Sequence, residues 1–130
     1  QHLQIIIQCL NNLLFKKYND ILFFNGLGDA IATLYHYLTP TTRVIGPSPA
    51  YSTHSSAEAA HANHHPLTYR LDPENHWYPD MDDLRNKVKY NPNIVAILLI
   101  NPDNPTGMVY PKDILQEIVE LAREYDLFLI

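Results

Sequence analysis

The segment Asn101-Pro102-Asp103-Asn104-Pro105-Thr106-Gly107 decides the interpretation of this chain. It follows an unbroken apolar run at residues 94–100 and precedes an amphipathic helical pattern at residues 111–125. An apolar run rich in β-branched residues predicts a strand that is buried on both faces of a parallel sheet. The segment is therefore expected to form a loop just past the carboxyl end of a central strand, where open α/β sheets place their ligands.

The rest of the chain alternates between helical and strand patterns. Helical spacing of apolar residues predicts helices near residues 3–14, 28–38, 52–63, 80–90 and 111–125. Short apolar runs predict strands at residues 21–24, 43–46, 66–71, 94–100 and 127–130. This alternation predicts βα units, and hence an α/β fold with three α/β/α layers and a mainly parallel sheet.

Length and composition bound the class of protein. The 130 residues suffice for one core, and we expect residues 1–130 to form a single incomplete domain, because the sequence starts at Gln1 and stops within an apolar run. A formal charge of −5 without a basic stripe predicts no nucleic-acid partner. No apolar stretch is long enough to span a membrane, so no membrane partner is expected. The lone Cys9 fits a reducing compartment, and we expect a cytoplasmic protein.

A glycine-containing turn, residues 25–30, separates a predicted strand from a predicted helix. Glycine allows close backbone approach, and the unpaired N–H groups of a helix start suit a phosphate. The alternative, a dinucleotide-binding turn, requires a small residue where Ile31 stands and an acid at the end of the next strand. That strand ends in Val44-Ile45-Gly46-Pro47, so the residues favour a simple phosphate site over a nicotinamide site.

The pattern Asn-Pro-x-Asn-Pro-Thr-Gly at residues 101–107 resembles the signature of the class I/II aminotransferases of fold type I, which use pyridoxal 5′-phosphate (PLP). The resemblance covers essentially the whole chain and implies the middle of the family's PLP-binding large domain. It further implies a homodimer that transfers an amino group between small amino-acid and 2-oxo-acid substrates.

Five cofactor-binding residues follow from this resemblance. The main-chain amides of Leu27, Gly28 and Asp29 are expected to hold the PLP phosphate, with the Asp29 carboxylate turned away. Tyr51 is expected to stack on the pyridine ring, and His54 to line the same pocket. The Asn104 amide is expected to bind the phenolic oxygen O3′, next to a cis Asn104–Pro105 bond.

The resemblance assigns no catalytic residue to this chain. The family's aspartate for the pyridine nitrogen, its cofactor-binding lysine and its substrate-binding arginine are expected after Ile130. Two alternatives stay open for the complete protein. One is an aminotransferase-like PLP-binding regulatory domain, with a DNA-binding domain before Gln1, and the other is a PLP decarboxylase or C–S lyase of the same fold.

Histidines 54, 61, 64 and 65 could suggest a metal site, but their spacing is poor for ligation and no cysteine or acid cluster joins them. We interpret them as solvated and expect no metal. Asp80, Asp82 and Asp83 are expected at a helix start, where acids suit the helix dipole, and not as a catalytic pair.

Overall fold

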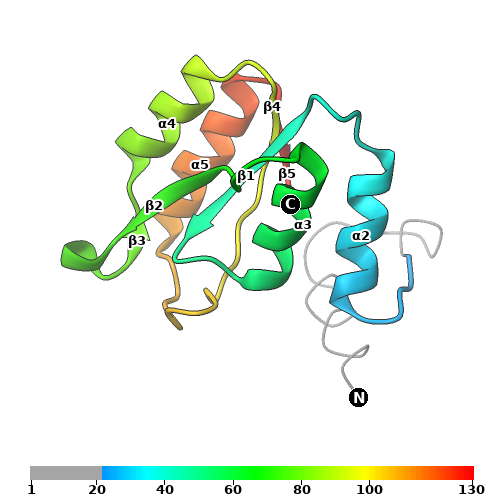
Figure 1. Ribbon diagram of the computed structural model, residues 1–130. Coiled ribbons are helices and arrows are strands. Elements are labelled where there is room, and N and C mark those ends of the chain that lie inside the picture. Colours follow the sequence, from blue (N-terminus) through cyan, green and yellow to red (C-terminus); the bar gives the residue numbers. More distant parts are fainter. Residues whose placement is uncertain (1–21) are drawn as a thin grey trace.

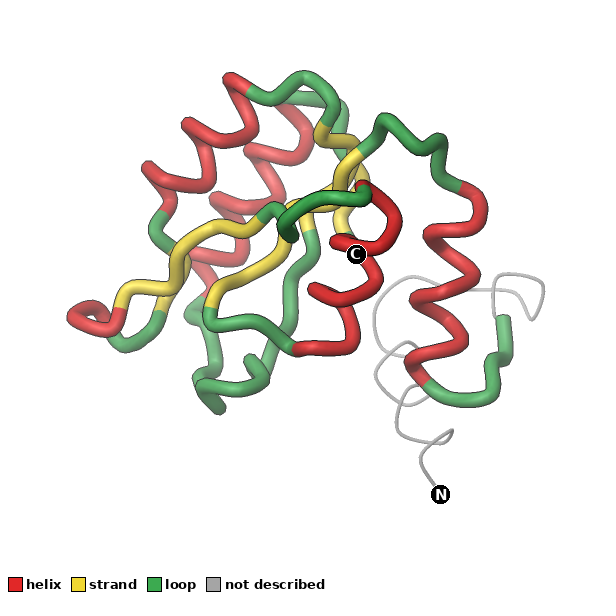
Figure 2. Tube along the Cα trace, in the orientation of Figure 1, coloured by secondary structure: helices red, strands yellow, loops and turns green. Residues whose placement is uncertain are grey.

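The structure is a computed structural model that describes residues 22–130 (Figures 1 and 2). The helix predicted near residues 3–14 lies outside the described residues, as do Cys9 and Ile21. The described part forms one sheet whose strands lie in the order β3-β2-β1-β4-β5. The strands are β1 (Arg43–Ser48), β2 (Thr68–Asp72), β3 (Tyr78–Pro79), β4 (Ile94–Ile97) and β5 (Phe128–Leu129).

The sheet is mainly parallel, as the alternating sequence pattern predicts. Strand β1 pairs in parallel with both β2 and β4, and β4 pairs in parallel with β5. Among the described strands only β3 is antiparallel, and it forms a short edge beside β2. Parallel strands need a crossover connection, which a helix supplies after each of β1, β2 and β4.

Within residues 22–130, four α-helices cover the two faces of the sheet, which confirms the three-layer α/β/α architecture. Figure 1 shows α2 and α3 on one side of the sheet and α4 and α5 on the other. Their bounds are α2 (Leu27–Tyr37), α3 (Ser52–Ala62), α4 (Met81–Tyr90) and α5 (Lys112–Glu124), and a short 3-10 helix, η2, spans Pro73–Asn75. The acids predicted at a helix start cap α4, since the Asp80 carboxylate accepts the Asp83 N–H.

The core lies on both faces of the two central strands because successive side chains point in opposite directions. Ile45 and Ile97, which are fully buried, pack in the cluster with α4 and α5. Val44 and Ala96, one residue earlier in each strand, pack against Tyr35 of α2. This arrangement explains why the β4 sequence is apolar without alternation.

Two predicted strands differ from the structure. Residues 22–24, predicted as part of a strand, are not in the sheet, and Leu22 and Phe23 are largely exposed. No strand of the described sheet pairs with them, and an apolar run alone cannot form a strand without a hydrogen-bonding partner. Strand β4 ends at Ile97 rather than at residue 100, although the Leu98 and Leu99 N–H groups still donate to Ile45 and Ile130 carbonyls.

A buried ion pair fixes α3 against the start of β1. The Glu58 carboxylate is fully buried on α3 and accepts from Nε and Nη2 of Arg43 and from the Leu67 N–H. The same Arg43 Nη2 also donates to the His65 carbonyl at 2.9 Å. One carboxylate thus joins a helix, a strand and the segment that leads into β2.

We predict that Glu58→Ala in the complete protein costs ~3 kcal/mol or more of unfolding free energy, because it leaves the Arg43 guanidinium and the Leu67 N–H without their acceptor. Urea unfolding measures this loss. The control is Glu124→Ala, which removes the exposed partner of Arg85 and should change stability much less. Equal losses in the two variants would contradict a dominant role for the buried pair.

Candidate functional site

Three segments meet the same edge of the sheet. Because β1 and β4 are parallel neighbours, the segments that follow them leave at one edge. Figure 1 shows the start of α2, the start of α3 and the loop after β4 along this lower edge. These are the segments that contain the five predicted site residues.

The first segment is the turn into α2. Gly26 occupies the N-cap position with φ 93°, a conformation that side chains disfavour, and no side chain caps the helix. The first helical hydrogen bond runs from the Ala30 N–H to the Gly26 carbonyl at 3.3 Å. The N–H groups of Leu27, Gly28 and Asp29 precede it and lack helical acceptors, so they form a positive end suited to an anion.

Among the described residues, no side chain blocks the N–H groups of this turn. The Asp29 carboxylate accepts the Asn25 N–H at 3.1 Å, so it turns back onto the preceding turn. At Gly28, an added Cβ would meet only Thr53 Cγ2, at 3.9 Å. The starts of α2 and α3 are therefore adjacent. The space beside Gly28 would also accept a small side chain, so crowding does not explain why this position is glycine.

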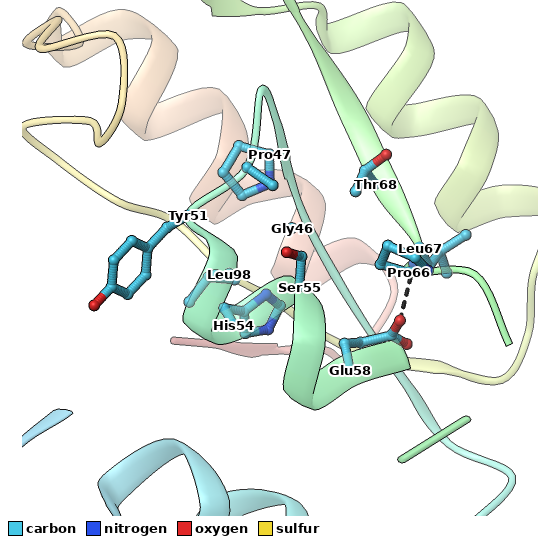
Figure 3. Close-up of a pocket in the computed structure, with 11 residues that line it drawn as sticks. Gly46, Pro47, Tyr51, His54, Ser55, Glu58, Pro66, Leu67, Thr68 and Leu98 are labelled. Carbon is cyan, nitrogen blue, oxygen red and sulfur yellow. Dashed lines mark hydrogen bonds between the residues drawn. The ribbon is translucent and has the colours of Figure 1, made fainter. Parts of the chain in front are cut away.

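The second segment contains Tyr51, which is half-buried at the N-cap position of α3. Its carbonyl accepts the His54 and Ser55 N–H groups, both at 3.2 Å, which fixes the backbone from which its side chain projects. Figure 3 shows the Tyr51 ring extending away from Ser55 and Glu58, while its backbone adjoins Pro47 and Leu98. The phenol ring thus projects outward from the packed interior of α3.

Behind Tyr51 lies a buried histidine. His54 is only 5% exposed, and its Nε2 is hydrogen-bonded to the Tyr35 hydroxyl at 2.9 Å. Its ring also packs on Gly46, where an added Cβ would lie 3.1 Å from Cε1 and from Nδ1. Burial lowers the pKa of His54, and the negative charge of Glu58 opposes this shift.

The interpretation of the four histidines as solvated is therefore wrong for His54. Its position three residues after Tyr51 places it on the first turn of α3, against the sheet. His61 is half-buried and its Nε2 lies 3.0 Å from the Thr42 carbonyl oxygen, whereas His64 and His65 are exposed. Within residues 22–130, no group of three or more histidine, cysteine or acidic side chains could hold a metal ion.

The third segment is the loop at residues 101–107, which is held by its own polar groups. The Asn101 Oδ1 atom accepts the Tyr110 N–H at 2.9 Å. The Asp103 carboxylate accepts both the N–H and the hydroxyl of Thr106, at 3.1 and 2.6 Å. Asn104 is exposed and precedes a cis peptide bond to Pro105, as the resemblance implies. Its amide makes no hydrogen bond to any described residue, so it is available to a ligand.

Sequence reasoning missed the buried polar residues beneath these segments. Tyr35, Glu58 and Asp103 make contacts with residues that the sequence pattern does not single out. One sequence feature could have indicated that Asp103 is buried. Asp103 lies between two Asn-Pro pairs, in a loop that must fold back on itself. For Tyr35 and His54, 19 positions apart, no local pattern indicates the pairing.

Comparison with known proteins identifies the family. Residues 4–130 match the family described as aminotransferase class I and II. The chain belongs to this family. It is similar to an uncharacterized aminotransferase of Methanocaldococcus jannaschii, with 68% identity over 85% of the chain and 26% of that relative. It is also similar to a glutamate-pyruvate aminotransferase of Haemophilus influenzae, with 37% identity over 85% of the chain and 27% of that relative.

Solved structures agree with this membership. An aminotransferase from Escherichia coli superposes with a TM-score of 0.72 at 35% identity, over 81% of this chain and 26% of that one. A C–S lyase from Staphylococcus hominis, at 23% identity and a TM-score of 0.79 over 91% of this chain and 30% of that one, shares the fold. The chain spans about a quarter of the length of the curated relatives named above. Within residues 22–130, no helix is both long enough and apolar enough to cross a membrane.

We predict that His54 makes the protein less stable in mild acid. Burial lowers the pKa of His54 in the folded state, so the unfolded state binds a proton more readily. The contribution of neutral His54 to the unfolding free energy is therefore fully present above the unfolded-state pKa of about 6.5, and it is lost as the pH falls below that pKa. Unfolding free energies measured from pH 7.5 down to pH 5 should show a weaker pH dependence in His54→Gln than in the unmodified protein. His64→Gln, at an exposed site, should leave the profile unchanged. Identical profiles for all three proteins would contradict the prediction.

Proposed function

We propose that the complete protein is a PLP-dependent aminotransferase and that this chain supplies part of the wall that holds its cofactor. The observation that carries the proposal is a combination of three features at one sheet edge: α2 N–H groups without an acceptor among the described residues, an outward Tyr51 ring and an exposed Asn104 amide. Family membership supports it, and the printed names of relatives indicate substrates. Those names include a glutamate-pyruvate aminotransferase and an alanine aminotransferase of Mycobacterium tuberculosis.

The residues present fit PLP in their chemistry. The N–H groups of Leu27, Gly28 and Asp29 would donate to its phosphate, where the helix dipole favours negative charge. Gly28 contributes no hydroxyl, so main-chain donors carry this contact. The Asn25 N–H holds the Asp29 carboxylate, which would repel the phosphate if it pointed the other way.

Tyr51 would orient the pyridine ring. An aromatic side chain stacks on such a ring with an offset, and a pair of this kind contributes roughly 0.5–1.5 kcal/mol beyond the area that it buries. The Tyr51 backbone is fixed by the first turn of α3, so its side chain projects from a defined place. His54 lies beneath on the same turn and fills the space against Gly46.

Asn104 would bind the phenolic oxygen of the cofactor. Its side-chain N–H can donate to the phenolic oxygen, and its carbonyl oxygen stays free to accept. Bound PLP supplies an electron sink for amino-acid chemistry. A donor at the phenolic oxygen tunes the acidity of the neighbouring group on the cofactor.

We further propose that the lysine that binds the cofactor and the arginine that binds the substrate carboxylate belong to other parts of the complete protein. Among the lysines of the described part, Lys87 pairs with Asp83 and Lys89 lies over the Tyr90 ring, both on α4. We also propose that the complete protein is a homodimer, as the family resemblance implies, and that it is cytoplasmic, which the lone Cys9 fits.

The activity can be tested directly with alanine and 2-oxoglutarate. We predict that the complete protein converts them to pyruvate and glutamate when loaded with PLP, and that it sediments as a dimer. Coupled detection of pyruvate and sedimentation velocity make the two measurements. PLP binding without amino transfer to any 2-oxo acid would contradict the aminotransferase proposal and would favour the regulatory or lyase alternatives. A stable, active monomer would contradict the dimer.

We predict that Asn104→Ala shifts the pH at which the visible absorbance of bound PLP titrates and lowers kcat about fivefold or more, because one hydrogen bond of about 1 kcal/mol is lost. The fold should be unchanged, since Asn104 is exposed. Asn75→Ala, which changes an exposed amide on η2, is the matched control and should behave like the unmodified protein. A titration of Asn104→Ala that matches the unmodified protein would show that Asn104 does not contact the phenolic oxygen.

A further inference from the structure

The hydrogen-bond ladder between β1 and β4 stops at a proline. The Leu98 N–H donates to the Ile45 carbonyl at 2.8 Å, whereas the Gly46 N–H points to the other neighbour and donates to the Leu67 carbonyl. In a parallel pair the donors of the two strands alternate, so the next bond between β1 and β4 would run from the N–H of residue 47 to the Leu98 carbonyl. Residue 47 is proline, which has no N–H. The Leu98 carbonyl therefore lacks its ladder donor on β1.

A tyrosine hydroxyl supplies a donor in its place. Tyr69 lies on β2, where it pairs with Pro47 in the parallel register. The Tyr69 side chain is fully buried in the core cluster that also contains Ile45 and Ile97. Its hydroxyl donates to the Leu98 carbonyl at 3.0 Å. Because β1 lies between β2 and β4, this hydrogen bond reaches past β1 to the end of β4.

The ends of β1 and β4 are where the chain leaves the sheet toward opposite faces. The helix α3 follows β1 on one side, and the loop at residues 101–107 leads from β4 to α5 on the other side (Figure 1). Open α/β sheets bind ligands between the strand ends at such a point. Pro47 and Leu98 line one pocket together with Tyr51 (Figure 3). A ladder bond at residue 47 would hold β1 and β4 together there, so the proline lets the two segments separate.

We propose that the Tyr69 hydroxyl replaces the ladder donor that Pro47 lacks, and that Tyr69 is a positioning residue for Asn104. This inference rests on the proposed function, in which Asn104 contacts the cofactor. The Asn104 amide makes no hydrogen bond to any described residue, so its position depends on the backbone that leads to it. Leu98 lies on that backbone, just before the loop at residues 101–107, and Tyr69 holds its carbonyl.

Three hydrogen bonds together fix the end of β4. The Leu98 N–H donates to the Ile45 carbonyl, and the Leu99 N–H donates to the Ile130 carbonyl, both at 2.8 Å. The Tyr69 hydroxyl adds the third bond, at the Leu98 carbonyl. Without it, a half-buried carbonyl would lose its donor, which costs free energy. The backbone before the loop would then be held through its N–H groups alone.

The first measurement is amide hydrogen exchange in the cofactor-free complete protein. Tyr69→Phe keeps the ring and removes only the hydroxyl, so exchange at Leu98 and Leu99 should be about fivefold faster, while the amides of α5 keep their rates. The control Tyr78→Phe removes the hydroxyl of a half-buried ring packed against the same cluster, and should leave these amides unchanged. Unchanged exchange at both leucines in Tyr69→Phe, or an equal acceleration throughout α5, would overturn the inference.

The second measurement restores the missing donor. Pro47→Ala supplies an N–H at residue 47, so in the Tyr69→Phe background it should slow exchange at Leu98 and Leu99 back toward the rate of the unmodified protein. With Tyr69 present, the acceptor already has its donor, and Pro47→Ala should not slow exchange. The same effect of Pro47→Ala in both backgrounds would show that Tyr69 does not replace a ladder donor, and would overturn the inference.

The third measurement is a double-mutant cycle on PLP affinity. Tyr69→Phe should weaken PLP binding severalfold when Asn104 is present and should have little further effect in Asn104→Ala. Equal losses in both backgrounds would mean that Tyr69 acts through general stability, and would overturn the positioning function. If the unmodified protein does not bind PLP at all, the proposed function fails, while the exchange measurements still decide whether Tyr69 holds the end of β4.

Discussion

The parallel pairing of β1 with β4 is the constraint on which the candidate site depends. Val44 and Ile45 pair with Ala96 and Ile97, so the two strands end at the same edge. The helix α3 then starts beside the loop that follows β4, and Leu98 continues the pairing through its N–H to the Ile45 carbonyl. If the pairing shifted by one residue, every side chain of the shifted strand would change face, and the two cores would lose their apolar residues.

The sequence predicted those parts of the fold in which local pattern and tertiary environment agree. The apolar face of α5 and the run at β4 gave correct elements, because each buries the same residues that define its pattern. Residues 22–24 show the limit of this reasoning. Their apolar run is equally strong, but a strand also requires a neighbour, which a local pattern does not contain.

The candidate site also contains residues that the sequence pattern revealed and residues that it did not. Glycines, prolines and the Asn-Pro repeat are visible in a sequence because they constrain the backbone locally, and they pointed to all three segments. The residues that support these segments from beneath were not visible. His54 resembles its exposed neighbours His64 and His65 in sequence, and only the packing of α3 on the sheet separates it from them. Asp103 looks like a solvent-facing loop acid until the fold encloses it.

The close contact between Gly46 and His54 also links two positions that are eight residues apart. An added Cβ at position 46 would sit 3.1 Å from the imidazole, which cannot move freely because Tyr35 holds its Nε2. Alanine at position 46 would therefore require a smaller side chain at position 54, or a displaced first turn of α3. Selection should thus act on the two positions jointly. During divergence of the family, a change at either one is expected to be accompanied by a compensating change at the other, and the pair should covary more strongly than its exposed neighbours.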